Sequence, residues 1–168
     1  MALRLKGSTS GVRQARNRII GMQRRSADFR SVFRWARKEL EEANRQNFAS
    51  QGLTSGRPWP PLSADYAGWK LANYGPLPTL IRTGDLYKDL TFLRGKPNSI
   101  GLRSATFGTN LPYAKFHQAG TRDMPRRRIV FAPDLFAQRL GRVILNYVVY
   151  NDDPGGLPTG QLRRLFRR

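Results

Sequence analysis

A long run of residues with the hydrophobic period of an α-helix constrains the fold more than any other feature of this chain. Between Ser26 and Phe48, apolar residues recur at i, i+3, i+4 and i+7, which places them on one helix face. We expect Ser26 to be the N-cap and Asp28 to lie in the first turn, where the helix dipole favours a carboxylate. At about 1.5 Å per residue, this helix would be about 35 Å long. The apolar face consists of Phe29, Val32, Phe33, Ala36, Leu40 and Ala43.

The segment that follows this helix is rich in proline. In "SGRPWPPLS", residues 55–63, three prolines remove backbone N–H donors and fix φ, which excludes a helix interior or a central strand. Trp59 lies between prolines, and we expect its ring to dock into a groove as an anchor. Beyond this segment, Ala64–Ala72 is expected to form a short helix.

The second half of the chain carries signals for several short elements. "TFLRGK" and "NSIGLRSATFGT" are rich in β-forming residues around "GKPN", which predicts a hairpin between residues 91 and 109. Pro112–Gly120 predicts a short helix, with Pro112 in its first turn and Gly120 as its C-terminal cap. Arg126–Pro133 is a candidate strand, and Asp134–Asn151 has the pattern of a second amphipathic helix.

These signals together predict an α+β fold. We expect a small antiparallel sheet packed with a long N-terminal helix and a C-terminal helix, with basic extended termini. The chain divides into a basic N-terminal segment (1–25), a single domain (26–150) and a flexible basic C-terminal tail (151–168). Within the first segment, Ala2–Gly7 alternates as a short strand does, and Ser10–Arg25 is compatible with a helix that Gly21 weakens.

The charge of the chain indicates its partners. Thirty Lys and Arg against eleven Asp and Glu give a net charge of +19, which favours a polyanion or an acidic protein as partner. A basic surface with no specific partner remains the alternative. The chain shows no recognisable motif for reading the base sequence of DNA. We therefore expect any contact with duplex DNA to be made with its phosphate backbone. In a strand, at most two of the three arginines at 126–128 can face one ligand. The candidate DNA- or partner-facing residues are Arg13, Arg16, Arg18, Arg24, Arg25, Arg126, Arg127, Arg128, Arg163, Arg164, Arg167 and Arg168.

The residue inventory argues against an enzyme. The chain has no cysteine and one histidine, so disulfides and thiolate sites are excluded and a histidine metal site is not expected. His117 has no carboxylate close in sequence except Asp123, and no phosphate-binding or nucleophile-elbow motif occurs. We therefore expect no catalytic residue, no cofactor and no metal. No apolar run approaches the roughly 20 residues of a membrane span, so no membrane partner is expected.

Three residues of the expected helix at 112–120 share one face. Tyr113, Phe116 and His117 stand at i, i+3 and i+4. We expect Phe116 to lie in the core. For Tyr113 and His117, the spacing leaves a core position and a subunit contact open.

The order of several motifs resembles one family. "GRPWPPLSADY", "LIRTGDLYKDLT", "FGTNLPYAKFHQAGT" and "MPRRRIVF" follow an amphipathic helix and precede another. This arrangement, over Asp28–Tyr150, resembles the virion morphogenesis, or tail-completion, proteins of tailed bacteriophages. Where that family usually reads "MPARPFL", this chain has arginines.

The resemblance implies a structural virion protein rather than an enzyme. Such proteins form rings, commonly hexameric, at the head–tail junction (neck), where they complete or terminate the tail and join it to the DNA-filled head after assembly in the host cytoplasm. The implied partners are further copies of the chain, connector or head-completion proteins, tail-tube proteins and duplex DNA in the channel. A head-side connector or stopper component, or a standalone basic nucleic-acid-binding protein, are the alternatives. The implied turn-setting or contact residues are Trp59, Gly84, Tyr87, Phe107, Gly108, Tyr113, Phe116, His117 and Gly120.

The net charge exceeds what DNA in such a ring requires. Duplex DNA over about 35 Å carries about 20 phosphates, whereas six chains of net charge +19 carry far more positive charge. We therefore expect some basic residues to line the DNA path and others, above all those of the two terminal segments, to face acidic neighbours.

Overall fold

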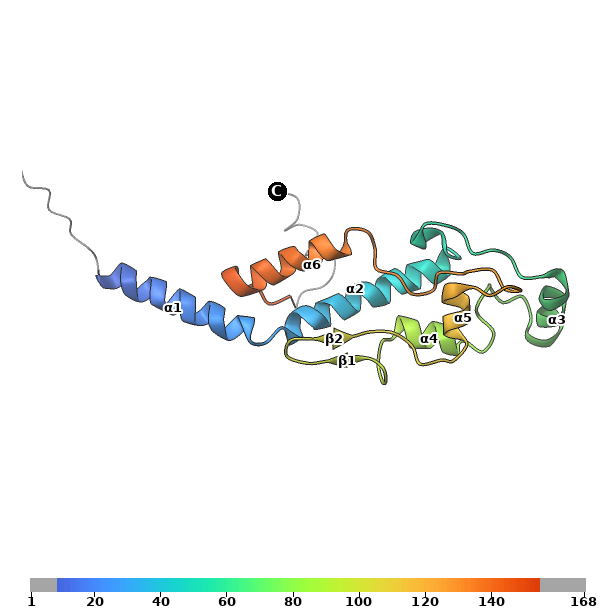
Figure 1. Ribbon diagram of the computed structural model, residues 1–168, viewed down its shortest axis with the longest axis horizontal. Coiled ribbons are helices and arrows are strands. Elements are labelled where there is room, and N and C mark those ends of the chain that lie inside the picture. Colours follow the sequence, from blue (N-terminus) through green and yellow to red (C-terminus); the bar gives the residue numbers. More distant parts are fainter. Residues whose placement is uncertain (1–8, 155–168) are drawn as a thin grey trace, which may run out of the picture.

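Helix α2 (Arg30–Ala49) is the central helix, and several of the other elements pack along it (Figure 1). The structure is a computed structural model that describes residues 9–154; the strand expected at Ala2–Gly7 and the four arginines of the C-terminal tail lie outside the described residues. The other elements, in chain order, are α1 (Thr9–Ser26), η1 (Leu53–Ser55), α3 (Ala64–Tyr74), α4 (Asp85–Thr91), β1 (Ser99–Ile100), β2 (Ala105–Thr106), α5 (Ala114–Ala119), α6 (Phe136–Leu145) and the π-helical turn η2 (Asn146–Tyr150).

The described chain is elongated, and its helices and one small sheet confirm the α+β class. Helix α6 lies along one side of α2, while the hairpin and α4 lie along the other. Helix α1 projects from one end of this body, and α3 lies at the opposite end (Figure 1). The basic N-terminal segment is therefore helical from Thr9 onward. No helix among residues 9–154 has the length and apolarity needed to cross a membrane.

The long helix starts later than the sequence predicts. Ser26 is the last residue of α1, and its hydroxyl donates to Gln23 O at 2.9 Å, so it does not cap α2. Asp28 acts at the start of α2 instead, because its Oδ1 accepts a hydrogen bond from the backbone N–H of Arg30 at 3.0 Å. Hydrogen bonds from the side chain and backbone of Arg30 lower the pKa of Asp28 to about 2. A Ser and an Asp two residues apart both carry an N-cap signal, and only the geometry separates them.

Two apolar clusters form the core, one on each half of α2. Around its first half, Val32, Trp35, Ala36 and Val143 are buried, with Phe29, Phe107, Phe136, Leu140, Ile144 and Tyr147 packed against them. Around its second half, the buried residues are Phe48, Trp59, Leu86, Leu90, Ala114 and Ile129. Helix α6 thus covers the start of α2, and α4, α5 and the Trp59 loop cover its end. The amphipathic pattern expected for 134–151 is confirmed by α6 and η2.

The hairpin exists, but its turn lies elsewhere than predicted. Ser99 pairs with Thr106 and Ile100 with Ala105, so the chain reverses over residues 101–104, where Gly101 N–H donates to Ser104 O at 2.8 Å. The first β-rich run does not take part. Its Thr91 ends α4, which packs on α2, and its Leu93, two residues beyond that helix, is buried.

The strand expected at Arg126–Pro133 is not formed. Its backbone donors are used by α5 and not by a neighbouring strand. The side-chain oxygen of Gln118 accepts from Ile129 N–H at 2.9 Å and from Val130 N–H at 3.0 Å. Arg127 N–H donates to His117 O at 2.7 Å. One amide side chain therefore replaces a strand partner and fixes this segment against α5.

Candidate interaction surfaces

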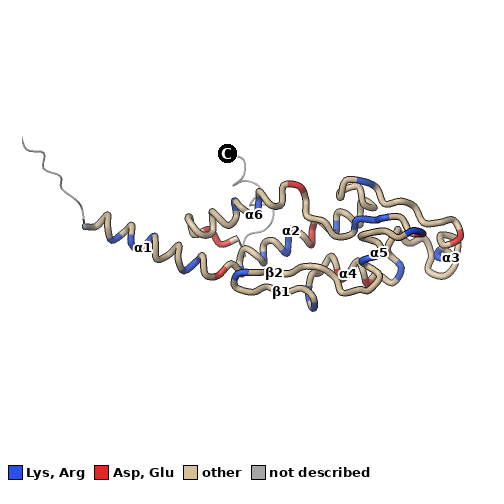
Figure 2. The backbone as a smooth tube through the Cα atoms, viewed as in Figure 1, with Lys and Arg blue, Asp and Glu red and all other residues tan. Residues whose placement is uncertain are grey.

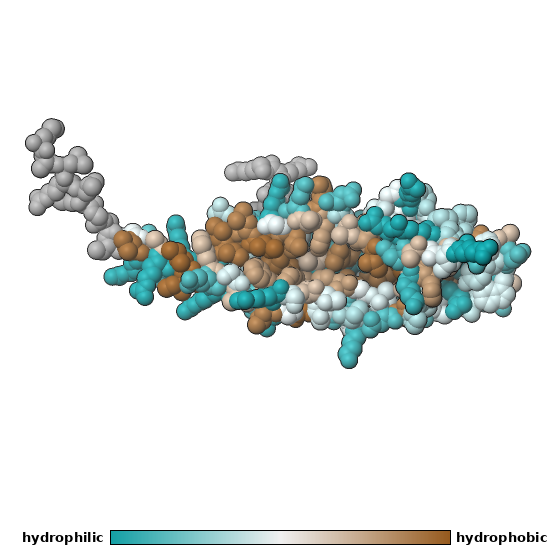
Figure 3. All heavy atoms as spheres, in the orientation of Figure 1, coloured by the Kyte–Doolittle hydropathy of each residue, from teal (hydrophilic) through white to brown (hydrophobic). Residues whose placement is uncertain are grey.

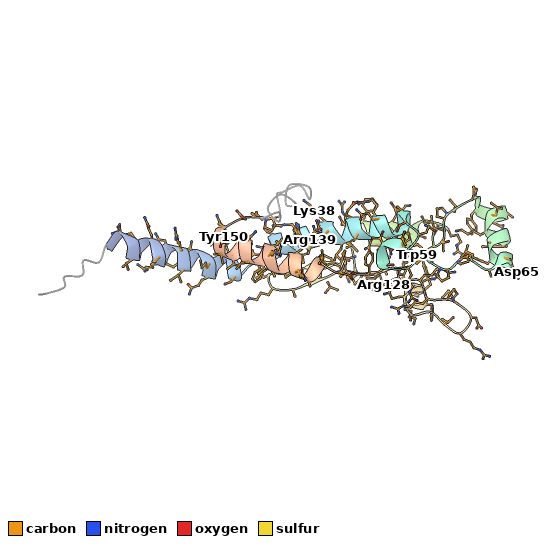
Figure 4. The ribbon with its side chains drawn as sticks, turned by 90° about the horizontal axis from the view of Figure 1, so that it is seen from above. Lys38, Trp59, Asp65, Arg128, Arg139 and Tyr150 are labelled. Carbon is orange, nitrogen blue, oxygen red and sulfur yellow. The ribbon has the colours of Figure 1, made fainter. Side chains whose placement is uncertain are left out.

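Trp59 fixes the proline-rich loop to the body. Its side chain is buried, its ring meets Phe48 edge-on at 5.2 Å, and its Nε1–H donates to Arg128 O at 3.1 Å. Figure 4 shows Trp59 beside Arg128 at the end of α2. The approach requires Gly52, because a Cβ at this position would lie 2.3 Å from Cδ1 of the Trp59 ring. The loop and residues 126–128 are thereby held side by side.

The junction of these two segments forms a basic groove, which we call the arginine groove. Its volume is about 530 Å³, and residues 55–60 line it together with Arg126 and Arg128. Arg57, Arg126 and Arg128 are exposed, and no acidic side chain is among the lining residues. Arg128 Nη1 donates to Ser55 O at 3.3 Å, and Arg126 Nε donates to Gln118 O at 3.1 Å. Their remaining donors suit phosphate or carboxylate oxygens.

Arg127 does not belong to this surface, contrary to its place among the expected partner-facing arginines. It is 4% exposed. Its Nε donates to Pro60 O at 2.9 Å and its Nη2 to Pro61 O at 2.8 Å. Burial lowers the pKa of its guanidinium. Arg127 therefore holds the proline-rich loop, while its two neighbours face outward.

Exposed aromatic side chains lie on α3, at one end of the molecule, and at α5, which shares a pocket with α3. The rings of Tyr66 and Trp69 stack at 5.5 Å, and Trp69 meets Tyr74 at 5.6 Å. Tyr113, at the N-cap of α5, and Phe116, within that helix, are 41% and 44% exposed, so the expectation that Phe116 lies in the core is wrong for the single chain. The reason is that α5 is only six residues long and packs through Ala114. We call Tyr66, Trp69, Tyr74, Tyr113 and Phe116 the aromatic end.

A pocket of about 300 Å³ opens at the aromatic end. It is lined by side chains from α3, from the residues around the start of α4, and from α5 and its N-cap. Among them are Tyr66, Lys70, Arg82, Thr83, Gly84, Asp85, Tyr113 and His117. Lys70 is buried, and its Nζ donates to Leu77 O at 3.0 Å and to Pro78 O at 2.6 Å. Burial lowers its pKa. This lysine therefore holds the loop after α3. The sequence did not predict this role, because a lysine in a short helix is usually exposed to solvent.

His117 is half-buried beside the pocket. Its Nδ1 is inaccessible to solvent and has no hydrogen-bond partner, and its ring meets Tyr113 edge-on at 6.1 Å. Burial, together with the charge of Arg127, lowers the pKa of His117. A histidine in this environment is held neutral at pH 7.

We expect this histidine to make the fold sensitive to mild acid. The folded pKa lies below the ordinary value of 6.5, so the unfolded chain binds a proton first as the pH falls. The free energy of unfolding therefore decreases as the pH drops from about 6.5 through the folded pKa. Urea unfolding at pH 7.5 and pH 5.5 should show this loss in the native chain and a smaller loss in His117→Gln. Equal losses in both would contradict the assignment. Asp28 does not interfere, because both its ordinary pKa of 3.8 and its folded pKa of about 2 lie well below pH 5.5.

The remaining expected shape-setting residues lie along the body. Gly84 and Gly120 have positive φ, at the start of α4 and the end of α5. Gly108 N–H donates to Asn98 Oδ1 at 2.8 Å next to the hairpin. Tyr87 packs on the second core cluster and Phe107 on the first. The structure therefore brings Tyr113 and His117 together, whereas Gly108 and Phe107 lie by the hairpin.

The arginines of α1 form a separate basic surface. Arg13, Arg16, Arg18 and Arg24 are exposed along the helix (Figure 2). Arg25 is half-buried and binds the body, because its Nε donates to Val148 O at 2.8 Å and its Nη1 to Asn151 Oδ1 at 3.3 Å. Of these five arginines, the one that fixes α1 to the body of the molecule lies in the last turn of the helix.

Several residues that position these surfaces were not anticipated. Asn47 is fully buried and its Nδ2 donates to Arg128 O at 3.0 Å, which connects α2 to the arginine groove. Gln118 joins α5 to residues 129–130. The sequence feature that could have predicted these roles is a polar residue on the apolar face of a helix. In the described part of the chain, no three His, Asp or Glu side chains gather as a metal-binding group.

Comparison with known proteins yields one match. Residues 9–139 match the model of the phage virion morphogenesis family. The matched range includes α1, the Trp59 loop, the aromatic end and the first residues of α6. No curated protein and no solved structure matches the chain.

Proposed function

Because the chain belongs to the phage virion morphogenesis family, we propose that it is a structural protein of the virion neck. In this role it forms a ring, commonly of six copies in proteins it resembles, at the head–tail junction. The ring completes or terminates the tail and joins it to the DNA-filled head. Assembly takes place in the host cytoplasm, with connector and tail-tube proteins as neighbours. Membership of a virion assembly family is the observation that carries the proposal.

The exposed surfaces of the described chain support a role in binding neighbouring proteins and DNA. Exposed aromatic rings at α3 and α5 are costly in a monomer and are typical of protein interfaces. Figure 3 shows a further apolar area over α6 and the adjoining part of α2. The arginine groove offers donors for phosphate or carboxylate oxygens. The proposal assigns these groups to neighbours and to DNA in the channel, and it includes no catalytic step, cofactor or metal.

Imaging of a phage that lacks this gene tests the proposal. We expect full heads beside separate tails of normal length, with joining restored when the gene is supplied from a plasmid. Overlong tails would identify a terminator that stops tube growth, which is the same neck role at an earlier step. Emptied heads would favour a head stopper instead. Intact infectious particles would overturn the neck assignment and favour a basic nucleic-acid-binding protein.

A further inference from the structure

Helix α1 carries an apolar stripe that is exposed at its first three residues, while the last, Met22, is half-buried near the turn of α1 that contacts η2. Val12, Ala15, Ile19 and Met22 are spaced by three, four and three residues, which is the spacing of a coiled-coil seam. Val12 is 71% exposed and Ile19 is 56% exposed. The helix projects from the body, and Figure 3 shows apolar patches along it between hydrophilic ones. We call these four residues the α1 seam.

The exposed apolar residues of the α1 seam are suited to contact with another protein. A single helix of this length is marginal in water, because helix formation without tertiary packing is unfavourable at short lengths. An exposed seam gains stability only when another apolar surface covers it. Phosphates of DNA cannot do so, since they attract the arginines and leave Val12 and Ile19 in water. The stripe therefore distinguishes α1 from a purely electrostatic DNA-binding arm.

The flanks of the seam define the charge of that partner. Arg16 and Arg18 border it in the positions that face a neighbouring helix, and α1 contains no acidic residue. Two α1 helices side by side would therefore oppose like charges. The acidic side chains of α2 and its start are also engaged within the chain, since Asp28, Glu39, Glu41 and Glu42 each pair with an arginine. A second copy, itself of net charge +19, is a poor match.

We propose that the α1 seam docks on a different, acidic protein: an apolar helix or groove bordered by Asp and Glu side chains. The carboxylates pair with Arg16 and Arg18, while the apolar surface covers Val12 and Ile19. In the neck this partner is a neighbouring virion protein, and to that extent the inference rests on the proposed function. Arg13 and Arg24, which lie away from the seam, remain free to face other anions.

A matched pair of substitutions separates a protein partner from DNA. Ile19→Asp and Asn17→Asp each change the net charge by −1, but residue 19 lies in the seam and residue 17 on the opposite face. Loss of apolar burial at residue 19 should weaken attachment to phage particles that lack the chain by about tenfold or more, and Asn17→Asp should change it by less than about twofold. Equal effects of the two would overturn the proposal, because phosphate binding depends on charge alone.

Site-specific crosslinking identifies the occupant. The chain has no cysteine, so Ile19→Cys and Asn17→Cys each carry a single thiol for a maleimide–benzophenone label. The full-length labelled chain is added to extracts of the phage that lacks the gene, and the mixture is irradiated. We expect residue 19 to give an adduct with another virion polypeptide, at an apolar segment flanked by Asp or Glu, in clear excess over residue 17. A nuclease-sensitive adduct, an adduct with a second copy, or no adduct at residue 19 would overturn the proposal.

The two experiments also keep this inference apart from the proposed function. If imaging places the chain outside the neck but the residue-19 adduct with an acidic protein persists, the neck assignment fails and the seam assignment stands. If the chain acts at the neck and residue 19 crosslinks to DNA or to a second copy, the seam assignment alone fails.

Discussion

Replacing Gly52 by alanine is expected to lower the free energy of unfolding by about 3–5 kcal/mol, as much as removal of a buried tryptophan side chain. Gly52 has φ +95, and a Cβ there would lie 2.3 Å from Cδ1 and 2.6 Å from Nε1 of Trp59. The indole would have to leave its site against Phe48 and give up its hydrogen bond to Arg128 O. Urea unfolding followed by tryptophan fluorescence measures the loss.

Gly56→Ala is the matched control. Gly56 lies at the other end of the same 3₁₀ turn with φ +105, but nothing lies within 4 Å of the Cβ that alanine would add. Its substitution should therefore cost only the left-handed backbone conformation, about 1–2 kcal/mol. The difference between the two variants isolates the contact with Trp59. If both variants lose the same free energy, the clash with Trp59 contributes nothing and the loop relaxes around a methyl group.

The helices of this chain were predictable because their signals are local and repeated. The apolar period of α2 and α6, the proline exclusion at 55–63 and the glycine cap after α5 each follow from a few neighbouring residues. Boundaries were less accurate, as Ser26 and Asp28 illustrate. The prediction of a strand at 126–133 was wrong, because a β-rich pattern does not reveal whether a neighbouring strand is present to pair with it. Here a distant side chain, Gln118, supplies the acceptor.

The candidate surfaces were harder to predict, because exposure depends on tertiary contact. Phe116 is on a face that looks like core, yet α5 is too short to bury it in one chain. Lys70 looks like a solvated helical residue, yet two carbonyls of the loop after α3 hold it. The arginine-rich composition indicated polyanionic or acidic partners, but it could not separate arginines that face outward from those that hold the fold together.

The triplet at 126–128 shows this separation most clearly. Arg127→Met is expected to lower the free energy of unfolding by about 2–4 kcal/mol, because two charge-assisted hydrogen bonds to Pro60 O and Pro61 O are lost in a buried site. Arg126→Met and Arg128→Met, in exposed positions, should each change it by about 0.5 kcal/mol or less. Urea unfolding of the three single variants measures the contrast.

Elution from a heparin column in a salt gradient reverses the order of the three variants. Arg126→Met and Arg128→Met remove exposed charge from the arginine groove and should elute at lower salt than the native chain, while the folded Arg127→Met should elute close to it. All three remove one positive charge, so net charge alone would shift all three equally. That result would mean that Arg127 is accessible to polyanions, and the loop at 60–61 would then need another anchor. The expected result assigns the outer arginines of one short run to partners and the middle one to the fold, in keeping with the alternation of exposed and buried side chains at residues 126–129.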